Sequence, residues 1–152
     1  MSQPMQSDWQ IRQAIAADAD RLTSCMHAAY SRHQIHISKE LLPPMQVDYS
    51  SEINQYPVWV VEMNRKIVGG LIMVFDPEEA SIANIAVDPS AQGMGIGGAL
   101  MKMAESQGKE RGFRFLHLAT HVVLEGNLSL YQHLGWQKVG GDKHRIFMRK
   151  SI

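Results

Sequence analysis

A chain of 152 residues is long enough to build one domain around its own hydrophobic core. Its 15 basic and 15 acidic side chains cancel, which argues against a general nucleic-acid or membrane-surface binder. The single cysteine, Cys25, excludes an internal disulfide and a thiolate metal cluster and favours a cytoplasmic protein. We therefore expect one domain, residues 1–152, in the cytoplasm, with neither nucleic acid nor a membrane as a partner.

The amino-terminal third predicts a strand, a helix and a long irregular segment. Residues 9–14 alternate between apolar and polar, as in a half-buried strand. Asp18 or Asp20 can then cap a helix. The apolar face of this helix would hold Leu22, Cys25, Met26 and Ala29, with the thiol buried and inert. Residues 31–56 contain two prolines, two histidines and mixed charge, and predict a functional loop with one short helix around residues 39–42.

A hairpin is expected next. Residues 58–62 and 67–75 are apolar runs separated by four residues, and Asn64 between them suits a tight turn. A second turn over residues 76–79 leads into the next strand.

The centre of the chain combines a strand, a glycine-rich loop and a helix. Residues 82–87 are apolar and predict a buried strand that ends at Asp88-Pro89, because proline cannot donate to a sheet. Four glycines follow within residues 93–98, and residues 99–111 predict a helix closed by Gly112. Successive backbone amides at the start of a helix, with no Cβ atoms above them, form a site for a phosphate.

The remainder of the chain predicts three strands and one helix. Residues 115–119 form a strand that the preceding helix connects to residues 82–87, so these two strands should be parallel. A short helix over residues 126–134 is followed by strands at 137–139 and 144–149 around Gly140-Gly141. The fold class predicted is α+β, with a sheet of six or seven strands that is antiparallel except at its centre.

Three interpretations of the glycine-rich loop are possible. Gly93 to Gly98 match the dinucleotide pattern G-x-G-x-x-G, but five residues separate the strand from the first glycine, and the first acidic residue after the next strand is Glu125. The glycines could instead serve only close packing, although four in six residues are more than packing requires.

The third interpretation uses two sequence blocks. Residues 85–89 and 92–100 resemble the acyl-CoA signature of the GNAT superfamily of N-acetyltransferases, in which Gln92, Gly95 and Gly97 fill the core pattern. Residues 127–136 resemble a second block of that family, with Asn127, Tyr131 and the ending Leu134-Gly135-Trp136. The order of elements over residues 9–149 is also similar to that of the family.

This resemblance implies a GNAT-like fold with about four helices and a splayed parallel pair of strands at the centre of the sheet. It also implies acetyl-CoA as co-substrate, without a metal. The pyrophosphate would bind the loop amides, and the pantetheine arm would bind the main chain of the preceding strand, whose unpaired edge suits its amides. The implied binding residues are Ile85, Val87, Gln92, Gly93, Met94, Gly95, Ile96, Gly97, Gly98 and Asn127.

The family chemistry implied is direct attack of a primary amine on the thioester in a ternary complex. Tyr131 would be the general acid to the CoA thiolate, and a backbone amide near Val87 would stabilise the oxyanion. Asn127 shares a helix face with Tyr131, and Leu130 and Leu134 beside it are expected in the core.

The sequence offers several candidates for the general base. Residues 81–87 contain no acid, so His121 is the substitute, or a water chain to bulk solvent, Glu52, Glu78 or Glu79. His117 has the same strand parity and is expected to pack in the core.

The acceptor is expected to be a small-molecule or peptide amine, and a homodimer is left open. Its pocket would be lined by His33, His36, Tyr49, Glu52 and Tyr56. The two histidines lack a third ligand at a suitable spacing and do not predict a metal site. The alternative function is a non-catalytic acyl-CoA sensor or partner module.

Overall fold

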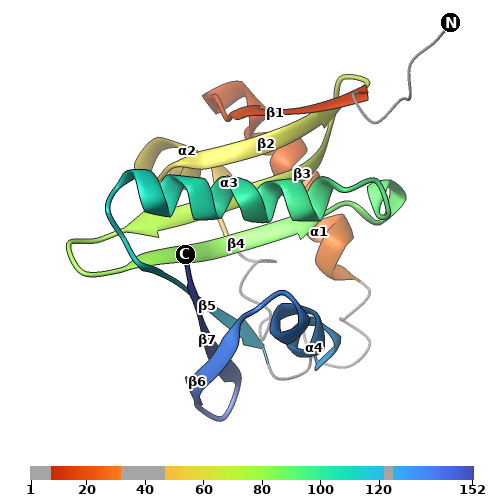
Figure 1. Ribbon diagram of the computed structural model, residues 1–152. Helices are drawn as coiled ribbons and strands as arrows, with labels where there is room; N and C mark the ends of the chain where they lie inside the picture. The colour runs from red at the N-terminus through yellow and green to blue at the C-terminus, as the bar shows by residue number, and fades with distance from the viewer. Residues whose placement is uncertain (1–7, 32–46, 122–124) are drawn as a thin grey trace, which may run out of the picture.

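The computed structural model describes residues 8–31, 47–121 and 125–152, which form one seven-stranded sheet (Figure 1). Its strand order is β1-β2-β3-β4-β5-β7-β6. The strands are β1 (Trp9–Gln13), β2 (Val58–Met63), β3 (Lys66–Phe75), β4 (Ala80–Val87), β5 (Phe115–His121), β6 (Gln137–Gly141) and β7 (Arg145–Ser151). In the described part of the chain, only β4 and β5 pair in parallel. The mixed sheet predicted from the sequence is confirmed.

Helices cover both faces of this sheet. The described residues form α1 (Ala19–Ser31), α2 (Tyr49–Gln55), α3 (Ile96–Glu110) and α4 (Glu125–His133), with short 3-10 turns η2 (Ala16–Asp18) and η6 (Pro89–Ala91). Helix α3 lies across the front of the sheet, and α1 and α2 lie behind it (Figure 1). None of the helices seen in the described ranges is long and apolar enough to span a membrane.

Two adjacent glycines in β3 let helices approach from opposite sides. A Cβ atom on Gly69 would lie 3.0 Å from Cγ2 of Ile96 in α3, and one on Gly70 would lie 2.7 Å from Cδ1 of Leu22 in α1. Because neighbouring residues of a strand face opposite ways, the pair brings both helices close to the same point of the sheet. The start of α3 is thereby held against the centre of the sheet.

A β-bulge in β4, on the side paired with β3, lies where the pairing of β4 with β5 ends. Asn84 pairs with Ile72 of β3 and Ile82 pairs with Met73, so Ala83 is an extra residue on β4. Pairing of β4 with β5 covers only residues 80–82, which lie directly before the bulge. Beyond it β4 diverges from β5, as Figure 1 shows for the whole group β5-β7-β6. The last five residues of β4 therefore have no β5 partner among the described residues.

The structure corrects three element assignments. Helix α2 lies in the segment predicted to be irregular, and the Asp48 carboxylate caps it by accepting hydrogen bonds from the amides of Ser50 and Ser51. Helix α3 begins at Ile96 rather than Ala99, so its first turn includes two glycines that propensity alone assigns to the loop. The glycines at 140 and 141 belong to β6, and the turn that follows is organised by Asp142. The short helix expected at 39–42 lies outside the described residues.

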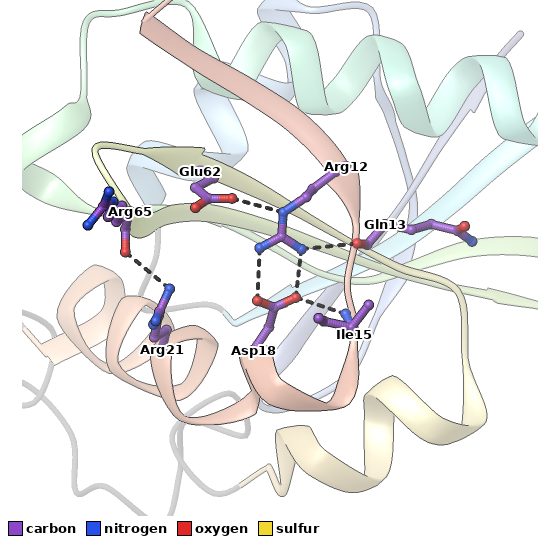
Figure 2. A network of polar contacts seen from close by, with 7 residues as sticks. All are labelled: Arg12, Gln13, Ile15, Asp18, Arg21, Glu62 and Arg65. Carbon is purple, nitrogen blue, oxygen red and sulfur yellow. Dashed lines mark hydrogen bonds and ion pairs between the residues drawn. The ribbon is translucent and has the colours of Figure 1, made fainter.

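A partly buried ion pair fixes the amino-terminal strand (Figure 2). The Arg12 guanidinium donates to both carboxylate oxygens of Asp18, at 2.8 and 2.9 Å, and its Nε donates to Glu62 at 2.9 Å. Asp18 also accepts a hydrogen bond from the amide of Ile15. The sequence had offered Asp18 or Asp20 as the cap of α1, and the Asp18 carboxylate serves this ion pair instead. The hydrogen bond from Arg12 lowers the pKa of Asp18. The network joins β1, β2 and the entry to α1.

Candidate functional site

A pocket of about 490 Å³ lies where β4 ends, and α1, α4 and the start of α3 surround it. The glycine-rich loop forms one wall and the diverging end of β4 forms the floor. Its lining residues are Ala29, Tyr30, Ile85, Ala86, Val87, Ala91, Gln92, Gly93, Gly95, Ile96, Gly97, Gly98, Met101, Leu130, Tyr131 and Leu134.

The loop presents unpaired amides to this pocket. Gly93 and Gly95 both have φ of +84°, a left-handed conformation that favours glycine, and Gly95 is the N-cap of α3. The first hydrogen bond within α3 runs from the amide of Ala99 to the carbonyl of Gly95, at 3.1 Å. The amides of residues 96–98 therefore precede the helical hydrogen bonds, at the positive end of the helix dipole. This is the geometry of an anion site.

Small residues keep these amides accessible. A Cβ atom on Gly98 would meet nothing within 4 Å, and one on Gly97 would come no closer than 3.8 Å to Val87. Close packing therefore does not require either glycine, which argues against the packing-only interpretation. The described lining residues carry no charge, and the backbone dipoles among them favour an anion.

The predicted loop residues are not equivalent. Gln92, Gly93, Gly95, Gly97 and Gly98 all line the pocket. The Ile96 side chain is buried in the core, so only its backbone faces the site. Met94 does not line the pocket, and its side chain is 37% exposed.

The end of β4 offers main-chain groups to the same pocket. The amide of Asp88 donates to the carbonyl of Val68 in β3 at 2.8 Å. Hydrogen-bonded positions alternate along an antiparallel pair, so Ala86 also faces β3, whereas Ile85 and Val87 direct their polar groups to the open edge. The Ile85 carbonyl already accepts a hydrogen bond there, from the Tyr30 hydroxyl at 3.2 Å.

Tyr131 reaches the pocket from α4. Its ring meets the Trp136 ring edge-on, with 6.0 Å between the ring centroids. The Trp136 amide donates to the Tyr131 carbonyl at 2.9 Å, which fixes this end of the helix. Among the described residues, the Tyr131 hydroxyl has no hydrogen-bond partner. Burial raises the pKa of Tyr131, so the phenol stays protonated at neutral pH.

Two leucines of α4 were placed wrongly by the helical pattern. Leu130 is 52% exposed and Leu134 is 41% exposed, and both line the pocket instead of entering the core. Leu128 and Tyr131 pack on the core in their place. The wall of the pocket formed by α4 is therefore apolar around a single phenol.

The remaining predicted polar residues are only partly placed. His121 ends β5 and Asn127 lies in α4, but their side chains lie outside what the structure describes. His117 is half-buried rather than packed in the core, because the buried face of β5 is formed by the alternate residues Leu116, Leu118 and Thr120. His33 and His36 lie outside the described residues, and the described ranges contain no cluster of three His, Cys, Asp or Glu side chains able to hold a metal.

The α1 wall differs from the acceptor wall predicted from the sequence. Tyr49 is buried in the core and does not line the pocket, and Tyr56 is exposed at the end of α2. Glu52 is half-buried, and burial raises its pKa. Tyr30 lines the pocket instead. It lies four residues after Met26, so the apolar stripe of α1 could have identified it as a phenol at the end of that stripe.

The dinucleotide interpretation does not fit the fold. A dinucleotide fold needs a mostly parallel sheet with repeated strand–helix–strand units. The described sheet has one parallel pair, which joins strands over only three positions.

Comparison with known proteins gives one family. Residues 22–136 match the model of the acetyltransferase (GNAT) family. An uncharacterised N-acetyltransferase of Escherichia coli, YjgM, is 33% identical over 85 residues, which cover 53% of this chain and 51% of that protein. N-acetyltransferase 8B of Homo sapiens is 29% identical over 97 residues, which cover 60% of this chain and 43% of that protein. The chain thus spans about half the length of these curated relatives.

Solved structures share the fold over nearly the whole chain. The PaiA N-acetyltransferase of Thermoplasma acidophilum, crystallised in complex with coenzyme A, superposes with a TM-score of 0.84 and 16% identity. That match covers 95% of this chain and 99% of the other. The ribosomal-protein-S18-alanine N-acetyltransferase of Escherichia coli superposes with a TM-score of 0.70 and 22% identity, covering 95% and 94%.

Proposed function

Since the chain belongs to the GNAT family of acetyltransferases, we propose that it transfers an acetyl group from acetyl-CoA to a primary amine. The membership expected from the two sequence blocks is confirmed, because the family model covers more than half of the chain. The observation that carries the proposal is the pocket in which the amides of α3, the open edge of β4 and the Tyr131 hydroxyl meet.

Acetyl-CoA would bind along two sets of main-chain groups. Its diphosphate suits the amides of residues 96–98, where a negative charge is stabilised by the helix dipole. Its pantetheine arm contains two amides, and the polar groups of Ile85 and Val87 offer the pairing that a missing strand would supply. Asn127 on α4 is proposed to support the same arm. This arrangement directs the thioester toward Tyr131.

The proposed reaction moves the acetyl group from the thioester sulfur to the amine nitrogen. The amine nitrogen attacks the thioester carbonyl carbon, and the C–S bond then breaks to give an amide and the CoA thiolate. Tyr131 donates its proton to the sulfur and regains one from solvent, while the nitrogen loses a proton to a base. The backbone amide of Val87 would stabilise the oxyanion.

The raised pKa of Tyr131 has two consequences. It keeps the phenol in its proton-donating form, but it also makes the phenol a weaker acid. The same apolar surroundings raise the pKa of a leaving thiol, because burial disfavours every anion. Donor and acceptor therefore shift in the same direction, and proton transfer remains feasible.

The general base is proposed to be His121. Its place at the end of β5 brings it to the strand end that adjoins α4. An ascending limb near pH 6.5 in the profile of kcat/KM, present in the wild type and absent in His121→Ala, is the expected result. An unchanged profile in the variant would exclude His121 and leave the proton to a water chain that ends in solvent or at Glu52, Glu78 or Glu79.

The experiment that tests the function is an amine screen. Purified protein is mixed with acetyl-CoA and a panel of small-molecule amines and peptides, and the release of free thiol is followed. We expect turnover with at least one primary amine. Binding of acetyl-CoA without turnover on any amine would favour the sensor function instead.

The protein is proposed to act as one cytoplasmic domain.

A further inference from the structure

We propose that Tyr30 binds the attacking amine and makes the enzyme selective for primary over secondary amines. The proposal rests on the acetyl transfer proposed above. It concerns the phenol that α1 contributes to the pocket, as distinct from Tyr131 of α4.

The pocket contains two phenols with different hydrogen-bonding capacity. The Tyr131 hydroxyl has no described partner, so its proton remains available to a sulfur. The Tyr30 hydroxyl lies 3.2 Å from the carbonyl of Ile85 and 3.3 Å from Oδ1 of Asn84. Both of these atoms are acceptors, so the single proton of Tyr30 is already committed.

A buried amide fixes this orientation. Asn84 is 7% exposed, and its Nδ2 donates to the hydroxyl of Tyr49 at 3.2 Å. Its Oδ1 is therefore the atom that faces Tyr30, and it can only accept. Tyr49 and Asn84 act as positioning residues behind the phenol.

What Tyr30 can still offer the pocket is a lone pair. A phenol oxygen accepts hydrogen bonds as well as donating one, and among the described residues nothing donates to it. Its natural ligand is an N–H group. Because Tyr30 bonds to Ile85 on the open edge of β4, an N–H bound to it lies beside the proposed path of the thioester arm.

The number of N–H groups on the amine then matters. After attack, a primary amine carries two N–H bonds, one for Tyr30 and one for the base. A secondary amine carries only one, which the base must remove to form the amide. The hydrogen bond to Tyr30 therefore stabilises the transition state of a primary amine only.

The test is Tyr30→Phe, which keeps the ring and removes the hydroxyl. The substrates are a primary amine that the wild type acetylates and the N-methyl derivative of that amine. We expect kcat/KM for the primary amine to fall about tenfold, while kcat/KM for the N-methyl amine stays within about twofold. The variant should stay folded with a lower melting temperature, because the buried Oδ1 of Asn84 loses its donor, and the KM for acetyl-CoA should stay within about twofold of the wild-type value.

A matched control uses a hydroxyl on the same helix. Thr23 donates to the carbonyl of Ala19 at 2.7 Å and does not line the pocket, so Thr23→Val should preserve the preference for primary amines. Equal losses on both amines in Tyr30→Phe would overturn the proposal, as would a parallel loss of affinity for CoA. A wild type that turns over no amine would overturn the proposed function itself, and this inference with it.

Discussion

Replacing Gly98 with alanine should stabilise the protein and weaken its binding of CoA. Gly98 lies in the first turn of α3, and an added Cβ would meet nothing within 4 Å. Alanine is a better helix former than glycine by about 0.5–1 kcal/mol. For a chain of this size that gain raises the melting temperature by about 1–4 °C.

Because Gly98 lines the pocket, the same methyl group would take up space proposed for the diphosphate. It would keep a phosphate at a distance at which the hydrogen bonds from residues 96–98 are lost or lengthened. Loss of one such charge-assisted bond costs about 1.5–3 kcal/mol, which corresponds to at least a tenfold higher Kd for CoA.

Calorimetric titration with CoA and thermal unfolding measure the two effects on one sample. Gly112→Ala, at the other end of α3, is the matched control. Gly112 has φ of +86°, so alanine there should cost about 1–2 kcal/mol of stability and leave the CoA affinity unchanged. A folded Gly98→Ala protein that binds CoA as tightly as the wild type would refute the assignment of the loop.

Three further predictions concern side chains. Tyr131→Phe should lower kcat about 10²-fold and change CoA affinity only a few-fold, and an unchanged kcat would remove the general acid. The pKa of Asp18 is lowered by Arg12, so this pair stabilises the fold above the ordinary aspartate pKa of about 4 and loses its effect as the pH falls below it. Urea unfolding between pH 7 and pH 3 should therefore show a shallower pH dependence in Asp18→Asn than in the wild type, and identical slopes would contradict this. Burial raises the pKa of Cys25 to about 12, so iodoacetamide at pH 8 should modify it only after unfolding, and rapid labelling of the native protein would contradict the burial.

Most of the sheet was predictable because local signals agree with the tertiary structure. The hairpin of β2 and β3 forms across Asn64, whose φ is +53°, as expected of an asparagine in a tight turn. Gly112 and Gly135 end their helices with positive φ. The parallel pairing of β4 and β5 followed from the connecting helix, and the structure confirms it.

The errors occur where local preference and tertiary contacts disagree. The sequence of α2 has a weak apolar pattern, and its one clear local signal is the cap residue Asp48. Leu130 and Leu134 fit a core stripe, but α4 packs on the sheet through Leu128 and Tyr131 instead. The contact of Tyr30 with Ile85 joins residues 55 positions apart, and no local pattern predicts its partner.

The bulge at Ala83 makes the open edge of β4 depend on a single inserted residue. Ile82 and Asn84 pair with consecutive residues of β3, Met73 and Ile72, as if they were neighbours in a regular strand. Deletion of Ala83 would therefore leave a regular strand whose pairing with β3 is unchanged. In such a shortened chain, β4 would pair with β5 beyond residues 80–82, and the gap between the two strands would be lost. The shortened chain would keep the order of its strands and helices but lose the open edge of β4. Binding of acetyl-CoA and regular pairing of the sheet therefore make opposite demands on position 83.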